Sequence, residues 1–477
     1  MNKSIIFHII GWILTIEAFL MIIPCIVALI YQEQSGYSFL ITLIACLIIG
    51  VPLVIIKPKN HVFFAKEGFF VVALGWIVLS IVGAFPFFIS GEIPNYIDAL
   101  FENVSGFTTT GSSILSDVEA LSYCMLFWRS FTHWIGGMGI LVFILAIMPM
   151  AGGETMHIMR AESPGPAVEK VVPRMRSTAS LLYLIYFGMT MLQLILLLVG
   201  GMPLFDSLTI SLATAGTGGF AIKNSGCADY TTYQQTIITI FMLLFGVNFN
   251  IYTLILFKKV KMAIKSEELR AYFLIVVTAT ILIALNLGGY KNFFPSIHHA
   301  AFQVSSVLTT TGYSTVDFNQ WPTFSKIILV WLMFIGACSG STSGSMKISR
   351  ILIMLKTIFK ELSYLIHKRS IKVLKFDGKK IEHETMRSIN VFFISYIMIF
   401  AASVLIVSLD NFDFTSSLTA VAATLNNVGP GLELVGPIGN FGSFSTLSKF
   451  VMMFDMLCGR LEVFPVLLLL NPKNWKH

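Results

Sequence analysis

The sequence Phe107-Thr108-Thr109-Thr110-Gly111-Ser112 has three partial repeats further along the chain. Each repeat places a glycine in a short loop after a helix-like segment, and the four glycines are Gly111, Gly218, Gly312 and Gly429, at intervals of 107, 94 and 117 residues. Glycine holds backbone angles that let consecutive carbonyl groups point the same way. A ring of such carbonyls replaces the water shell of a small monovalent cation. Four such loops on one chain therefore predict a cation pore built by a single polypeptide.

The composition indicates a membrane protein. Of the 477 residues, 56% are hydrophobic and 12% are charged, and the mean hydropathy is +0.80. An ordinary soluble domain is about 25% charged. Apolar runs long enough to cross a bilayer recur along the whole chain. We therefore expect an all-α, multi-pass protein of the cell (inner) membrane, surrounded by the lipid bilayer.

One pattern recurs four times: an apolar helix, a short amphipathic segment, a glycine loop and a second apolar helix. An opening helix pair within residues 1–60 lacks the glycine loop, and the four units that follow cover residues 61–150, 179–258, 266–360 and 385–472. The predicted fold is two N-terminal helices plus four helix–pore-loop–helix units in a pseudo-fourfold arrangement. We expect continuous second helices over 121–148, 237–257 and 450–470, and an interrupted one over 327–359.

The positions of the basic residues predict the topology. Lysine and arginine gather in the connections between units and near both ends of the chain, so these parts are expected in the cytoplasm. Each glycine loop must then enter the membrane from the outer face and return to it. The short segments before the loops fit half-membrane pore helices whose C-terminal ends aim negative dipole charge at a cation. Asp98, Asp206 and Asp413 lie near the starts of three of them, where a carboxylate can cap the helix.

Other function classes find little support in the sequence. The six cysteines contain no Cys-x-x-Cys pair, the nine histidines are scattered, and no cluster of His, Asp and Glu predicts an enzyme or a bound cofactor. The basic residues do not combine with aromatics into one face, so no nucleic acid is expected as a partner. The main alternative is an ion-coupled secondary transporter of a small solute, built from broken helices around a midplane site. That class usually has inverted repeats, whereas these four units share one orientation.

The loops resemble those of the Trk/Ktr/HKT superfamily of potassium transporters, most closely its TrkH/TrkG branch. The matching motifs are Thr-Thr-Gly in the first and third loops, Thr217 to Phe220 in the second, Asn426 to Pro430 in the fourth, Trp134 to Gly139, and Gly459 to Glu462. The resemblance implies potassium uptake through a selectivity filter, with potassium as the transported substrate. The filter residues that it implies are Thr109, Thr110, Gly111, Gly216, Thr217, Gly218, Thr310, Thr311, Gly312, Asn427, Val428 and Gly429.

The same resemblance implies partners and an ion preference. It predicts a homodimer with one pore per subunit, and a TrkA-like cytosolic nucleotide-binding subunit that controls opening. Sodium-preferring relatives carry serine in place of the first filter glycine, so Gly111 favours potassium.

Two cationic residues inside apolar segments are candidates for gating. Arg460 lies in the second helix of the last unit, where a cation facing the pore would oppose potassium entry. The alternatives are a salt bridge with Glu462 or Asp455, or a cation that packs on the flank of the helix. Lys347 ends a run of small residues that includes Gly340 and Gly344 and that should break the helix. In the family a similar loop blocks the path below the filter. We favour a gate here over a plain kink.

Arg129 and His133 lie one helical turn apart in the second helix of the first unit. They can line the outer pore, but we favour hydrogen bonds to neighbouring loops.

Overall fold

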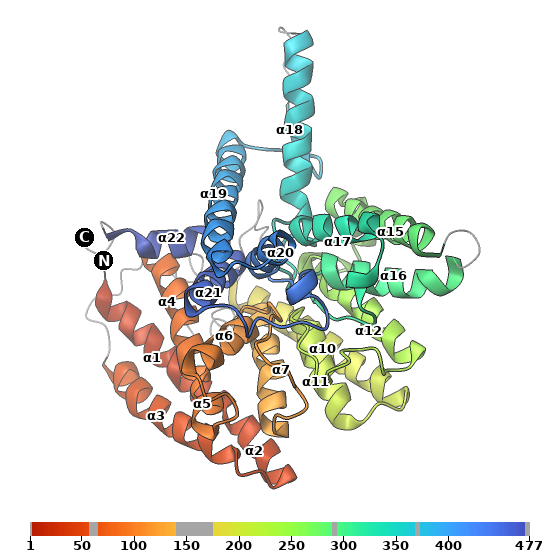
Figure 1. Ribbon diagram of the computed structural model, residues 1–477. Coiled ribbons are helices and arrows are strands. Elements are labelled where there is room, and N and C mark those ends of the chain that lie inside the picture. Colours follow the sequence, from red (N-terminus) through yellow and green to blue (C-terminus); the bar gives the residue numbers. More distant parts are fainter. Residues whose placement is uncertain (1, 57–64, 140–174, 289–292, 368–372, 473–477) are drawn as a thin grey trace.

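The computed structural model describes residues 2–56, 65–139, 175–288, 293–367 and 373–472. Almost every element in them is a helix (Figure 1). Six of these helices are long and apolar enough to cross a membrane, or seven if one bent pair is counted as a span. The prediction of an all-α, multi-pass fold is confirmed.

Three helices precede the first glycine loop unit. They are α1 (Lys3–Leu20), α2 (Ile22–Tyr31) and α3 (Gly36–Ile55). Helices α1 and α2 together form one 29-residue candidate span. Helix α1 packs on α3 and α4, so the opening pair lies against the first unit.

The remaining elements repeat one order. The first unit has α4 (Ala65–Gly83), α5 (Phe85–Ser90), α6 (Tyr96–Phe107) and α7 (Tyr123–Met138). The second has α10 (Met175–Val199), α11 (Leu204–Gly216), α12 (Thr232–Phe245) and α13 (Phe249–Leu256), and α14 (Val260–Lys265) leads onward. The third has α15 (Glu267–Gly288), α16 (Phe293–Leu308), α17 (Thr323–Ile335) and α18 (Ile348–Ile366). After the short strands β1 (Lys375–Phe376) and β2 (Lys379–Lys380), the fourth has α19 (His383–Val407), α20 (Phe414–Leu425), α21 (Thr446–Arg460) and α22 (Phe464–Leu470). Single 3-10 turns lie at Phe318–Gln320, Ser408–Asp410 and Glu433–Val435.

The second helices of the second, third and fourth units are broken. The third breaks between α17 and α18, as the run of small residues predicts. The predictions of continuous helices over 237–257 and 450–470 were wrong: α12 and α13 meet at 90°, and α21 and α22 are separated by residues 461–463. Asn248 caps the new helix start by accepting from the amide of Asn250, and Pro465 lies in the first turn of α22. In the first unit α7 ends at Met138, and residues 140–148 of the predicted helix lie outside the described residues.

The short helices before the loops are α6, α11, α16 and α20. Of the three predicted N-caps, the one at Asp413 is confirmed. Asp413 accepts a 2.9 Å hydrogen bond from the amide of Ser416 at the start of α20. The predictions for Asp98 and Asp206 were wrong. Asn95 caps α6, which leaves Asp98 to pair with Lys449 at 2.6 Å. Asp206 lies inside the first turn of α11 and pairs with Lys223 at 3.9 Å.

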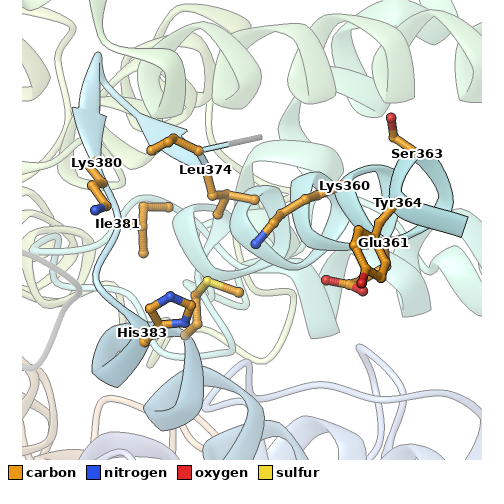
Figure 2. A pocket seen from close by; sticks show the side chains of 10 residues that line it. Lys360, Glu361, Ser363, Tyr364, Leu374, Lys380, Ile381 and His383 are labelled. Atoms are coloured by element: carbon orange, nitrogen blue, oxygen red, sulfur yellow. The ribbon is translucent and has the colours of Figure 1, made fainter. Parts of the chain in front are cut away.

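Helix α18 projects from the rest of the molecule with α19 beside it (Figure 1). Near its far end a groove opens between α18, the β1–β2 hairpin and the start of α19 (Figure 2). Lys360 and Glu361 of α18 and His383 of α19 are among the side chains that line this groove. It shares no lining residue with the four glycine loops.

We predict that Asp413→Ala destabilises the folded protein by about 1 kcal/mol, the usual cost of losing a helix N-cap. The hydrogen bonds from Ser416 lower the pKa of Asp413. The stabilisation is therefore fully present above the ordinary pKa of an aspartate and is lost as the pH falls through the lowered one. Thermal unfolding of the purified protein in detergent between pH 7 and pH 3 measures this, with Glu361→Ala, at an exposed site on α18, as the control. Equal losses of stability at both ends of the pH range would contradict it.

Candidate functional site

The four glycine loops share one backbone conformation. In each loop a residue with φ between 54° and 58° follows the short helix: Thr109, Thr217, Thr310 and Asn427. The amide of the next residue bonds the carbonyl five positions earlier, at 2.8–3.0 Å: these residues are Thr110, Gly218, Thr311 and Val428. A glycine with φ between 74° and 98° comes third: Gly111, Gly219, Gly312 and Gly429. Three loops thus have the three-residue register expected from the sequence.

The second loop lies one residue later than we expected. The sequence pattern suggested Gly216, Thr217 and Gly218, but Gly216 is the last residue of α11. The dihedral angles and hydrogen bonds place Thr217, Gly218 and Gly219 opposite Thr109, Thr110 and Gly111. The second-loop equivalent of Gly111 is therefore Gly219, which the sequence analysis missed because Gly218 and Gly219 are adjacent and indistinguishable by type.

Contacts between the loops close into a ring. A β-carbon placed on Gly111 would lie 2.1 Å from the carbonyl oxygen of Gly218, and one on Gly219 would lie 1.7 Å from that of Thr311. The series continues from Gly312 to the carbonyl of Val428, at 2.2 Å, and from Gly429 to that of Thr110, at 2.8 Å. Each loop therefore presses its glycine against the central residue of the next loop, and the last loop returns to the first. A side chain at any of these positions would collide with backbone.

A cavity lies on one side of the ring, and we call it the mouth. One glycine from each loop lines it, together with Arg129, Lys223 and other residues of the segments that leave the loops. Arg129 forms a buried ion pair with Glu102 at 2.8 Å, so its charge is balanced within the protein. Its Nη1 also donates to the carbonyl of Ala221 at 3.0 Å, which joins α7 to the second loop segment.

His133 lies behind the ring, fully buried. Its Nδ1 is 2.7 Å from the carbonyl oxygen of Gly106 in α6, and the amide of Phe220 donates to its Nε2 at 3.3 Å. The prediction that Arg129 and His133 hydrogen-bond neighbouring loops is confirmed, and Arg129 in addition lines the mouth.

The other side of the ring is covered by residues 336–347, which we call the 336–347 loop. Gly344 donates its amide to Thr310 Oγ1 at 2.9 Å, and a β-carbon on it would lie 2.6 Å from the carbonyl oxygen of Asn426. At the far end of the loop, the carbonyl of Gly340 accepts from the amide of Phe249 at 3.0 Å. The loop therefore connects the break in the second unit to the third and fourth glycine loops.

Arg460 joins this loop to the first unit. Its Nη1 donates to the carbonyl of Thr342 at 2.6 Å and to Thr109 Oγ1 at 3.3 Å. Its Nη2 donates to the carbonyls of Gly136 and Gly137 at 2.5 and 2.6 Å. The two acids considered as its partners have others: Glu462 pairs with Arg350, and Asp455 accepts from Ser403. Arg460 thus lies on the side of the ring opposite the mouth.

Lys347 is buried at the end of the 336–347 loop. Its Nζ donates to the carbonyl and the hydroxyl of Ser343, so the side chain folds back on its own loop. Lys347 has φ 74°, in the left-handed region, where α18 begins. Its contacts thus close the loop on itself and do not extend to the ring.

The chemistry available at the ring is coordination by oxygen. The central residue of each loop places its backbone carbonyl at the ring, and oxygen is the donor that suits hard monovalent cations. Within the described part of the chain, no group of three or more His, Cys, Asp or Glu side chains is arranged to hold a metal ion.

A helical membrane protein whose four glycine loops close into a ring has an architecture suited to passing a cation. The chain belongs to the TrkH family of cation transport proteins, whose model matches residues 35–477. It is 37% identical to the Trk system potassium uptake protein TrkH of Escherichia coli K12, and 32% identical to TrkG of the same strain, with all of each chain covered. The crystal structure of the potassium transporter TrkH from Vibrio parahaemolyticus superimposes with a TM-score of 0.89 over all of both chains, at 31% identity. The resemblance stated from the sequence is confirmed.

We predict that Gly219→Ala abolishes cation flux while Gly201→Ala, at a glycine with similar φ and no atom near its added β-carbon, reduces it little. The added β-carbon at position 219 would collide with the carbonyl of Thr311 and break the ring, whereas Gly201 costs only backbone strain. Flux into liposomes, normalised to folded protein, measures both variants. Normal flux in Gly219→Ala would overturn the assignment of Gly219 to the ring.

Proposed function

We propose that this protein takes up potassium across the cell membrane through a selectivity filter made of its four glycine loops. The observation that carries the proposal is the closed series of contacts in which each glycine meets the central carbonyl of the next loop. Such packing fixes the carbonyl positions, which is what a filter needs in order to replace the hydration shell of one ion. The relatives that are named potassium uptake proteins support potassium as the ion.

The filter residues in this proposal are three from each loop. They are Thr109, Thr110 and Gly111; Thr217, Gly218 and Gly219; Thr310, Thr311 and Gly312; and Asn427, Val428 and Gly429. Potassium is the substrate, held transiently at these residues, and the transport step requires no other cofactor. In this arrangement the four units form a pseudo-fourfold pore.

The gate in this proposal is the 336–347 loop together with Arg460. Gly344 lets the loop run close to the backbone of Asn426, and Gly340 supplies a left-handed backbone conformation beside the Asn248 side chain. Lys347 bonds the end of the loop to Ser343. The bonds from Arg460 to Thr342 and Thr109 hold the loop under the ring and place a positive charge on the exit path. Opening requires this side chain and the loop to separate.

The proposed assembly is a homodimer in the cell (inner) membrane with both termini in the cytoplasm. Helices α1 and α22, which hold the two ends of the chain, lie near each other (Figure 1). From Leu355 onward helix α18 exposes apolar side chains, with Phe359 and Leu365 each 69% exposed, as a lipid-facing or subunit-facing helix requires. A cytosolic nucleotide-binding subunit of the TrkA type is the proposed regulator, acting on the gate through α18.

The test of the proposed function is rubidium-86 uptake into liposomes that contain the purified protein, with excess potassium or sodium as competitor. We expect potassium to abolish uptake and sodium to leave it nearly unchanged. Equal competition by both ions would contradict the potassium assignment. Uptake that requires a proton or sodium gradient and an organic solute would instead favour a coupled transporter.

We predict that Arg460→Ala raises rubidium flux several-fold, because it removes both the charge on the path and the bonds that hold the 336–347 loop. Arg460→Lys separates these two effects, since lysine keeps the charge but cannot bond four oxygens with a planar fork. High flux in both variants assigns the barrier to the bonds, and high flux in the alanine variant alone assigns it to the charge. Unchanged flux in a folded Arg460→Ala variant would remove Arg460 from the gate.

A further inference from the structure

The four loops differ at their central position. Thr110, Thr311 and Val428 occupy it in three loops, whereas the second loop has Gly218. Gly218 does not have the positive φ that would demand glycine there. A β-carbon on it would instead lie 2.2 Å from Nδ1 and 2.3 Å from Cγ of His133. The imidazole of His133 thus occupies the space that a side chain fills in the other three loops.

The second loop also lacks the internal support that two of the others have. In the first loop the hydroxyls of Thr108 and Thr110 lie 2.8 Å apart, and in the third loop those of Thr309 and Thr311 also lie 2.8 Å apart. The same two positions of the second loop hold Gly216 and Gly218. With a third glycine at Gly219, ordering this loop costs more backbone conformational entropy, because glycine loses more freedom on folding than any other residue.

His133 supplies the missing support from outside the loop. A neutral imidazole has one N–H and one acceptor nitrogen, and the amide of Phe220 can only donate. This pairing assigns the acceptor role to Nε2 and the proton to Nδ1, which donates to the carbonyl of Gly106. The imidazole of His133 therefore connects the last turn of α6 to Phe220, the residue that follows Gly219. The guanidinium of Arg129 also packs on this residue, 4.0 Å from the centre of the Phe220 ring.

The geometry points to His133 as the positioning residue of the second filter loop. Its imidazole replaces the side chain that Gly218 lacks, and its Nε2 fixes the amide of Phe220, so that the carbonyls of this loop stay at the spacing that suits potassium and not sodium. This inference rests on the proposed function. The inference goes beyond the proposed function because the selectivity of the second loop then depends on α7, a helix of the first unit.

The first test uses two variants that each keep one of the two bonds. His133→Gln places an amide oxygen where Nε2 accepts from Phe220, and His133→Asn places an amide nitrogen where Nδ1 donates to Gly106. We expect His133→Asn to lower the preference for potassium over sodium about tenfold, the factor that a lost hydrogen bond of about 1.4 kcal/mol carries. We expect His133→Gln to stay close to the unmodified protein. Competition for rubidium-86 uptake, normalised to folded protein, gives both numbers.

The second test uses the contact between the imidazole of His133 and Gly218. Gly218→Ala should lose selective uptake because its β-carbon collides with the imidazole, and combining it with His133→Ala should recover at least part of the loss. A double variant no better than Gly218→Ala alone would overturn the inference, as would equal selectivity in His133→Asn and His133→Gln. The unmodified protein separates the two proposals. If the unmodified protein shows no preference for potassium, the proposed function fails. If it prefers potassium and all His133 variants have the same preference, only the role of His133 fails.

Discussion

The close approach of four glycines to four carbonyl groups is the constraint on which the rest of the molecule depends. Because β-carbons on Gly111, Gly219, Gly312 and Gly429 would lie between 1.7 and 2.8 Å from backbone of the neighbouring loop, each loop fixes the position of the next. The short helices α6, α11, α16 and α20 must therefore end at the same level around the ring, and the second helix of a unit must pack closely against the end of its short helix. Gly136 and Gly459 allow this, since their added β-carbons would lie 1.9 and 2.2 Å from carbonyls at the ends of α6 and α20.

The broken second helices raise a second problem, which is the backbone groups that the breaks release inside the membrane. An unpaired amide or carbonyl there costs several kcal/mol. The structure pairs several of these groups. Within the third unit the hydroxyl of Ser345 donates to the carbonyl of Met333. Across units, the amide of Cys338 donates to the carbonyl of Gly246, Ser345 to that of Asn426, and Arg460 to those of Thr342, Gly136 and Gly137. The polar groups at the helix breaks and those of the 336–347 loop thus form one hydrogen-bond network. Moving this loop away from the ring requires several of these hydrogen bonds to be replaced at the same time.

The sequence predicted the architecture better than the details that depend on backbone angles. Four glycine loops after short helices, and an interruption before Lys347, follow from residue types alone. The register of the second loop does not, because only the dihedral angles separate Gly218 from Gly219. The breaks after Phe245 and Arg460 lie in apolar runs whose length favours a single helix, and Asn248 and Pro465 were weak signals of the new helix starts. The sequence shows that Asp98 and Asp206 are carboxylates near a helix start, but it does not show the residue at which each helix begins, and this decides which residue caps it.

The ring is made by one chain, and this changes how it responds to mutation. In a pore assembled from four identical subunits, one substitution alters every quadrant at once, and a small defect is multiplied by four. Here each loop is encoded separately, so a substitution at Gly218, Val428 or His133 directly alters one loop and leaves the sequence of the other three unchanged. Ion preference can therefore drift in small steps, and the four loops are free to acquire different supports while the passage between them stays open to the same ion.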